Sequence, residues 1–165
     1  MDQISFMPDD RNIRKCRELL NRKAEEKGRP LTACTVTFGC QMNARDSEKI
    51  RGILYAAGFE PSESEEADLV LYNTCTVRDN ADRKVYGRLG YQQSLKKKDP
   101  DKMIGLCGCM MQETHVIERI RRDYPYVNLI FGTQNIEYLP ELLLHVLEEP
   151  QEQYISVLKA SPVIC

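Results

Sequence analysis

The chain has 165 residues, of which 42% are apolar and 29% charged, and its formal net charge is −2. This length and composition favour one well-buried domain with extensions over two separate domains. The small negative charge argues against the basic footprint that dominates nucleic-acid affinity, so an RNA partner would be held mainly by other parts of a larger molecule.

The N-terminal segment contains Asp2, Asp9 and Asp10, which is the wrong charge for a secretory signal. The longest apolar run, Met103 to Met111, is far shorter than a membrane span. We therefore expect a cytoplasmic protein without a membrane partner. Seven cysteines, an odd number, indicate reduced thiols or metal ligands rather than structural disulfides.

Helix-like and strand-like segments alternate along the chain after an amphipathic helix over residues 11–28. Strands are predicted at Leu31–Phe38, Phe59–Pro61, Ala67–Thr74, Met103–Cys107 and Asn128–Gly132. Further helices are predicted at Asn43–Ala57, Asp79–Lys98, Gln112–Asp123 and in a last segment that ends near Glu148. The tail from Pro150 to Cys165 has little pattern.

Glycine and proline mark several positions in these helices. Gly28 and Pro30 end the first helix, and Gly58 ends the second, where it suits the left-handed cap position. Gly87 and Gly90 lie inside a predicted helix, where each costs about 1 kcal/mol relative to Ala, and we expect close backbone packing as the compensation. Pro140 is compatible with the last helix only in its first turn.

The alternation of strands and helices implies parallel pairing with right-handed crossovers. We predict an α/β fold: a doubly wound, flavodoxin-like open parallel sheet of about five strands in the order 2-1-3-4-5, with helices on both faces. The chain is divided into an N-terminal helical extension over residues 1–30, a domain over 31–149 and a linker over 150–165.

Three cysteines, Cys40, Cys75 and Cys109, follow strands that are neighbours in this order. The carboxyl ends of parallel strands form the edge where ligands bind and where helix N-termini favour anions. Because three converging thiolates repel one another, this placement favours a metal or a cluster. A closed structural zinc site usually needs four ligands, and neither His115 nor His145 is placed to complete one. A [4Fe–4S] cluster with three thiolates and one open iron fits better.

Cys16, Cys34 and Cys107 are interpreted mainly as small buried residues, and Cys107 is the case where the choice is hardest. Cys107 lies two residues before Cys109 and would face the same way only in an extended strand. Because a loop begins at Gly108, we prefer Cys109 as the third ligand.

Four blocks of sequence occur in one order, and each is short: Thr37-Phe38-Gly39-Cys40-Gln41-Met42-Asn43 with Asp46-Ser47-Glu48; Asn73-Thr74-Cys75-Thr76-Val77-Arg78 with Ala81 and Lys84-Val85; Gly108-Cys109 with Gln112-Glu113; and Phe131-Gly132-Thr133 with Leu139-Pro140-Glu141-Leu142. Together they resemble the N-terminal domain of the radical S-adenosylmethionine methylthiotransferases, from about Thr32 to Glu149. The first two blocks are most similar to the tRNA 2-methylthio-isopentenyladenosine synthase branch, rather than to the branch that acts on a ribosomal-protein aspartate.

The resemblance implies that Cys40, Cys75 and Cys109 hold an auxiliary [4Fe–4S] cluster, whose open iron carries the sulfur to be inserted at C2 of isopentenyl-adenosine in tRNA. The implied partners are tRNA, a sulfur donor, a radical S-adenosylmethionine domain with a second cluster, and a C-terminal RNA-binding domain. The Cys-x-x-x-Cys-x-x-Cys motif of that second cluster does not occur in this sequence. We therefore expect a transferase fragment that binds the auxiliary cluster but is inactive alone.

Polar residues beside the cysteines are candidates for contacts with the cofactor, and none is assigned as catalytic. Asn43 and Asn73 could donate hydrogen bonds to cluster sulfurs or could shape the turns. Arg78 is a further candidate, as part of a basic edge that a solvated helix face would explain nearly as well.

A different class of function stays open from the residues alone. In a receiver-like α/β domain, Cys107 with Cys109, or Cys40 with Cys75, could form a reversible disulfide. The protein would then be a thiol redox or interaction module, colourless and with all its thiols titratable.

Overall fold

The computed structural model describes residues 10–38, 41–74, 79–108, 114–149 and 153–156. Within them the elements follow the order α1 (Asp10–Lys27), β1 (Thr32–Thr37), α2 (Gln41–Ala57), β2 (Glu60–Pro61), β3 (Leu69–Thr74), α3 (Asp79–Lys98), β4 (Met103–Gly108), α4 (Thr114–Asp123), β5 (Leu129–Phe131), the 3₁₀ helix η3 (Thr133–Tyr138), α5 (Leu139–Glu148) and β6 (Tyr154–Ser156). Among the described helices, none is long and apolar enough to cross a membrane.

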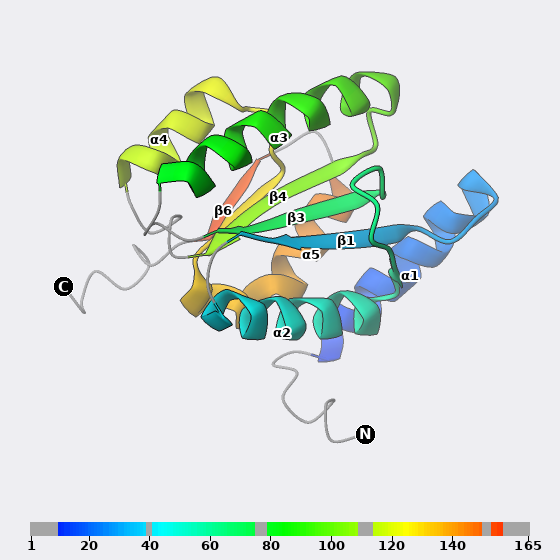
Figure 1. Ribbon diagram of the computed structural model, residues 1–165. Helices are drawn as coiled ribbons and strands as arrows, with labels where there is room; N and C mark the ends of the chain where they lie inside the picture. The colour runs from blue at the N-terminus through cyan, green and yellow to red at the C-terminus, as the bar shows by residue number, and fades with distance from the viewer. Residues whose placement is uncertain (1–9, 39–40, 75–78, 109–113, 150–152, 157–165) are drawn as a thin grey trace.

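The strands form one open sheet in the order β2-β1-β3-β4-β5-β6, and every pairing is parallel (Figure 1). The predicted α/β class and the predicted order of the first five strands are confirmed. The sheet is one strand wider than expected, because β6 lies in the tail for which no strand was predicted and pairs with β5.

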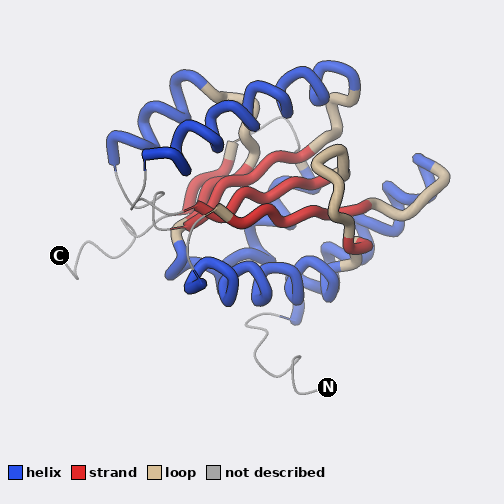
Figure 2. Tube along the Cα trace, viewed as in Figure 1, coloured by secondary structure: helices blue, strands red, loops and turns tan. Residues whose placement is uncertain are grey.

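Helices cover both faces of the sheet, with α3 and α4 on one side and α1, α2 and α5 on the other (Figures 1 and 2). Alternate residues of the central strands supply the two cores: Leu69 and Leu71 pack with α1, α2 and α5, whereas Val70 and Tyr72 pack with α3 and α4. Every residue of β3 and β4 is buried, as expected for parallel strands covered on both faces.

The N-terminal helix α1 is packed into the same layer as α2 and α5. Cys16 and Leu20 on its inner face are buried in the core that these helices share, at 0% and 2% exposure. The Cys16 thiol lies 3.6 Å from the Pro140 carbonyl oxygen, in α5. The segment expected as an extension therefore contributes to the hydrophobic core.

The local expectations for glycine and proline had mixed outcomes. As predicted, Pro140 lies in the first turn of α5, and Gly58 adopts a positive φ angle of 118° after α2. Gly28 also has a positive φ angle, 75°, after α1. The explanation offered for Gly87 and Gly90 was wrong. Among the described residues, a Cβ atom at either position would meet nothing within 4 Å, so close packing does not require glycine there.

Asp68, which is buried just before β3, connects segments at the edge of the sheet where the strands begin. Its carboxylate accepts hydrogen bonds from Arg29 at 2.7 and 2.9 Å and from the backbone N–H of Thr32 at 2.8 Å. Burial raises the pKa of this carboxyl, but the hydrogen bonds from Arg29 and Thr32 outweigh burial and lower the pKa below its ordinary value. A charged Asp68 thus connects the segment after α1 to β1 and β3.

Candidate functional site

The carboxyl ends of the central strands lie in register at one edge of the sheet. One row of paired residues crosses it from Thr37 in β1 through Asn73, Cys107 and Phe131 to Ser156 in β6. In the next row, Thr74 of β3 pairs with Gly108 of β4. Both strands therefore end at the same level of the sheet.

The predicted cluster ligands follow these strand ends in the sequence. Cys75 comes directly after Thr74, Cys109 directly after Gly108, and Cys40 directly before the first residue of α2. These three cysteines lie outside the described residues, as does Arg78. Within the described ranges, no group of three or more His, Cys, Asp or Glu side chains could hold a metal ion.

Gly108 brings the ends of β3 and β4 very close together. Its φ angle is +117°, which side chains of L-amino acids rarely adopt. A Cβ atom at Gly108 would lie closer than 3.0 Å to three backbone atoms of Thr74. The backbone therefore leaves the extended conformation at Gly108.

A largely buried hydrogen-bond network connects the second turn of α2 to the strand ends. The Ser47 and Thr37 hydroxyl oxygens are 2.5 Å apart, and Asn73 Nδ2 donates to Ser47 Oγ at 3.0 Å. The backbone N–H of Phe38 donates to the carbonyl oxygen of Asn73 at 2.8 Å. In β3, Thr74 Oγ1 donates to the carbonyl oxygen of Cys107 at 3.1 Å. Three strands and one helix are thus joined where the cysteine-bearing segments begin.

The two candidate asparagines have different positions. Asn73 is 1% exposed, and the hydrogen bond from its amide to Ser47 gives it a part in shaping this edge. Asn43 lies in the first turn of α2, and its side chain is outside the part of the chain that the structure describes.

Three other cysteines are buried free thiols, as predicted: Cys16, Cys34 and Cys107. Burial raises the pKa of Cys107, and the nearby Asp46 carboxylate raises it further. Burial also raises the pKa of Cys34, and it raises that of Cys16 to about 12 with a smaller effect from Glu148. All three are therefore protonated at neutral pH, which makes them poor nucleophiles.

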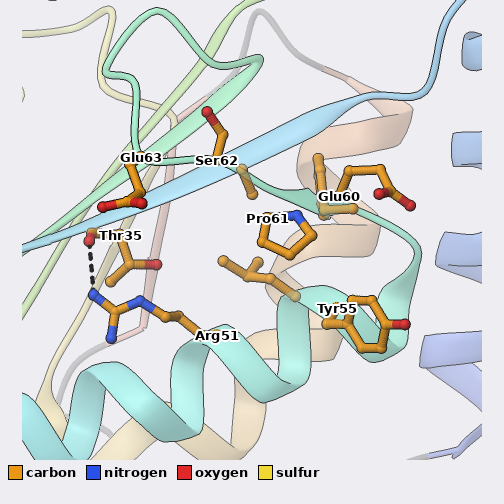
Figure 3. A pocket seen from close by; sticks show the side chains of 10 residues that line it. Thr35, Arg51, Tyr55, Glu60, Pro61, Ser62 and Glu63 are labelled. Atoms are coloured by element: carbon orange, nitrogen blue, oxygen red, sulfur yellow. Dashed lines mark hydrogen bonds between the residues drawn. The ribbon is translucent and has the colours of Figure 1, made fainter.

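An open groove of about 340 Å³ lies beside β1 and α2, away from this edge (Figure 3). Figure 3 shows Arg51 donating to the Thr35 carbonyl oxygen, a contact of 3.1 Å, with Tyr55 and Glu60 at the other end of the groove. None of the lining residues belongs to the register row at the strand ends or follows it.

One polar residue near the strand ends was not singled out by the sequence. Asn135, in η3 directly after β5, is 5% exposed, and its Oδ1 atom has no hydrogen-bond partner in the described structure. The only available signal was its place two residues after the Phe131-Gly132-Thr133 block, and a single asparagine in a polar stretch does not reveal burial.

Comparison with known proteins adds independent information. Residues 32–132, more than half of the chain, match the family described as "Uncharacterized protein family UPF0004". Several bacterial proteins named tRNA-2-methylthio-N(6)-dimethylallyladenosine synthase are also similar. The protein of Lachnoclostridium phytofermentans is 57% identical over 128 residues, covering 78% of this chain and 28% of the relative. That of Acetivibrio thermocellus is 48% identical over 139 residues, covering 84% and 29%. That of Clostridioides difficile is 50% identical over 131 residues, covering 76% and 27%.

Proposed function

The chain belongs to the uncharacterized protein family UPF0004, and from that premise we propose that it is the cluster-binding domain of a tRNA methylthiotransferase. The family resemblance drawn from the four sequence blocks is confirmed by the relatives named as synthases. The chain spans less than a third of the length of these relatives. The activity of a longer protein is therefore part of the proposal.

One observation carries the proposal: the described strand ends that lead into Cys75 and Cys109 are register partners in adjacent strands. Consecutive Cα atoms are only about 3.8 Å apart, so residues that directly follow such partners start close together. Cys40 directly precedes α2, whose N-terminus favours a thiolate. This arrangement supports three thiolate ligands for one cluster.

The geometry at Gly108 indicates whether the residues at this edge are suited to hold a cluster. Its missing Cβ allows the backbone before Cys109 to approach the backbone before Cys75, an approach that any other residue would block. The buried state of Cys107 supports Cys109 as the third ligand, because Cys107 points into the core that α1, α2 and α5 share. When bound, a [4Fe–4S] cluster with three protein thiolates would supply an iron that can bind a further sulfur.

The chain's own residues would hold and orient this group. Cys40, Cys75 and Cys109 bind it, while the hydrogen bonds among Thr37, Ser47 and Asn73 keep the surrounding backbone in place. We further propose that Asn43, Asn73 and Arg78 lie near the bound cluster and donate hydrogen bonds to it. Such outer contacts commonly tune the properties of a metal centre.

In the longer enzyme, the sulfur held at this edge would be inserted at C2 of isopentenyl-adenosine in tRNA. A radical S-adenosylmethionine domain with its own cluster and a C-terminal RNA-binding domain would complete that enzyme, and a tRNA substrate would place it in the cytoplasm. Residues 31–149 are proposed as the main part of the cluster-binding domain, with residues 1–30 as a helical extension whose α1 packs on it and with the part of 150–165 beyond β6 as a linker. Because this chain has no Cys-x-x-x-Cys-x-x-Cys motif, it should not cleave S-adenosylmethionine alone.

Anaerobic reconstitution of this chain with iron and sulfide tests the proposal. We expect a brown protein, and we expect Cys40→Ala, Cys75→Ala and Cys109→Ala to lose its iron and acid-labile sulfide. Cys16→Ala and Cys34→Ala are matched controls, because they remove buried thiols elsewhere and should retain the cluster. Iron retained by Cys109→Ala but lost by Cys107→Ala would move the third ligand to Cys107.

The same experiment distinguishes a cluster-binding domain from a thiol redox module. A colourless protein whose thiols all titrate after reconstitution would support the redox module and reject the cluster. If the cluster forms, methanethiolate should change its electronic spectrum by binding at the open iron. A spectrum unchanged by excess methanethiolate would indicate a fourth protein ligand.

A further inference from the structure

Three side chains in the described structure contain a buried polar atom without a hydrogen-bond partner: Thr35 Oγ1, Gln92 Oε1 and Asn135 Oδ1. An unsatisfied buried polar atom lowers the stability of the folded protein, so each one requires an explanation. Gln92 is partly satisfied, because its Nε2 donates to Glu65 O at 2.8 Å and to Tyr72 Oη at 3.0 Å. Thr35 lies at the groove beside β1, away from the strand ends.

Asn135 differs from the other two in its location. It follows β5, whose last residue Phe131 is in the same register row as Cys107 and Asn73. Its backbone N–H donates to the Gly132 carbonyl oxygen at 2.9 Å, which holds the first turn of η3 at the end of the strand. In Figure 1 the gold segment that includes η3 lies next to the start of α2, and the two helices are in contact. Asn135 therefore belongs to a short helix that follows β5 and contacts the helix that Cys40 precedes.

We propose that the Asn135 amide contacts the iron–sulfur cluster directly and donates an N–H hydrogen bond to one of its sulfur atoms. This inference rests on the proposed function, since it requires a cluster at the carboxyl edge. Without the cluster, Asn135 destabilises the domain by burying a polar atom that has no partner. A residue that costs stability in the free protein and gains a partner in the loaded one is typical of a binding site.

The chemistry of the cluster determines which end of the amide is used. Cluster sulfides and thiolate sulfurs carry negative charge and accept hydrogen bonds, so they match the amide N–H₂ rather than its oxygen. A half-turn about the Cβ–Cγ bond exchanges the oxygen and the amino group at nearly the same positions. An N–H···S hydrogen bond favours the more negative, reduced cluster and therefore raises its reduction potential.

The test compares Asn135→Leu with Thr35→Val in the whole 165-residue chain. Each change removes an unsatisfied buried atom, so each should leave the unfolding midpoint of the cluster-free protein unchanged or higher. After reconstitution, only Asn135→Leu should lower the reduction potential measured by redox titration, and it should release iron to a chelator about tenfold faster. Thr35→Val is the matched control and should keep the potential and the release rate of the unmodified chain.

A potential and a release rate that are equal in Asn135→Leu and in the unmodified chain would overturn the proposal. A cluster-free Asn135→Leu protein that unfolds earlier would overturn it too, because the amide would then have a stabilising partner in the free protein. Asn135→Asp gives a second check at a pH where its carboxyl is ionised: it keeps the shape but loses the N–H, and its negative charge should lower the potential further. Failure of the unmodified chain to take up any cluster would instead reject the proposed function.

Discussion

Replacement of Gly108 by alanine tests the geometry at the end of β4 without any cofactor. The φ angle of +117° places this residue in a region that side chains avoid, and such strain costs about 1–3 kcal/mol. The added Cβ would also collide with the backbone N, C and O atoms of Thr74. Backbone in a central strand cannot move aside as a flexible side chain can, so we add about 1–3 kcal/mol for overpacking. The expected loss is about 2–6 kcal/mol in the free energy of unfolding.

Gly90→Ala is the matched control for this change. Gly90 is exposed in α3, has no atom within 4 Å of its Cβ position among the described residues, and adopts a conformation open to alanine. This substitution should stabilise the protein by about 0.5–1 kcal/mol, since alanine favours helices more than glycine. The same chemical change is thus expected to have opposite signs at the two positions.

Urea denaturation followed by circular dichroism measures both values, and an unchanged dependence on urea concentration would show that the comparison is valid. Because a domain of this kind has a total stability of about 5–15 kcal/mol, the Gly108→Ala protein could be substantially unfolded even without urea. The reasoning would be refuted if Gly108→Ala lost less than about 1 kcal/mol, or if both variants shifted in the same direction by similar amounts.

Three further predictions concern buried polar groups. Ser47→Ala removes a hydroxyl that contacts both Thr37 and Asn73. It should lower the free energy of unfolding, measured in urea titrations, by about 1–3 kcal/mol. An unchanged free energy of unfolding would mean that this network does not hold α2 in place. Asp68→Asn should be less stable by about 1–3 kcal/mol at pH 7. Because the folded pKa of Asp68 lies below its unfolded value, the difference should shrink as the pH falls below about 4, and a difference independent of pH would contradict the charged pair. Burial lowers the pKa of Lys96 to about 8 from 10.5. Between pH 8 and 10.5 the unfolded chain therefore binds more protons at Lys96 than the folded protein does. The unmodified protein should gain stability relative to Lys96→Met as the pH rises over this range. A stability difference that does not change with pH would show that Lys96 titrates normally.

The strand order could be predicted because the central strands have an unambiguous composition. The runs Ala67–Thr74 and Met103–Cys107 are almost continuously apolar, which indicates strands covered on both faces, and β3 and β4 are buried along their whole length. Regular alternation with helices then restricts the pairing to a parallel, doubly wound sheet. The periodicity of side chains was sufficient for these elements.

The elements that sequence reasoning missed depend on contacts rather than on composition. In β6 three residues, Tyr154–Ser156, are too few to show an alternating pattern, and the strand is identified by its pairing with β5. The segment Thr133–Tyr138 had no predicted structure separate from the last helix, yet it forms a 3₁₀ helix before Pro140.

The candidate site, too, could be predicted only in part from the sequence. The sequence predicted which strands the cysteines follow, and the register of Thr74 with Gly108 places two of those strand ends side by side. The choice between Cys107 and Cys109 depended on whether the backbone stays extended at Gly108. The φ angle of Gly108 shows that it does not, whereas the residue type alone could not establish this. The burial of Asn135 likewise results from the packing of η3, which lies beyond any local pattern.

The short strand β6 has a consequence for how the protein can be divided. Its backbone covers the outer side of β5, and Gln153 strengthens the attachment by donating to the carbonyl oxygens of Tyr124 and Val127 at 3.2 and 3.0 Å. A chain cut after Glu149 would leave the buried, apolar strand Leu129–Phe131 as an open edge, ready to pair with a second molecule. The smallest unit in which β5 is paired on both sides should therefore extend through Ser156, and shorter versions should self-associate through the edge of β5.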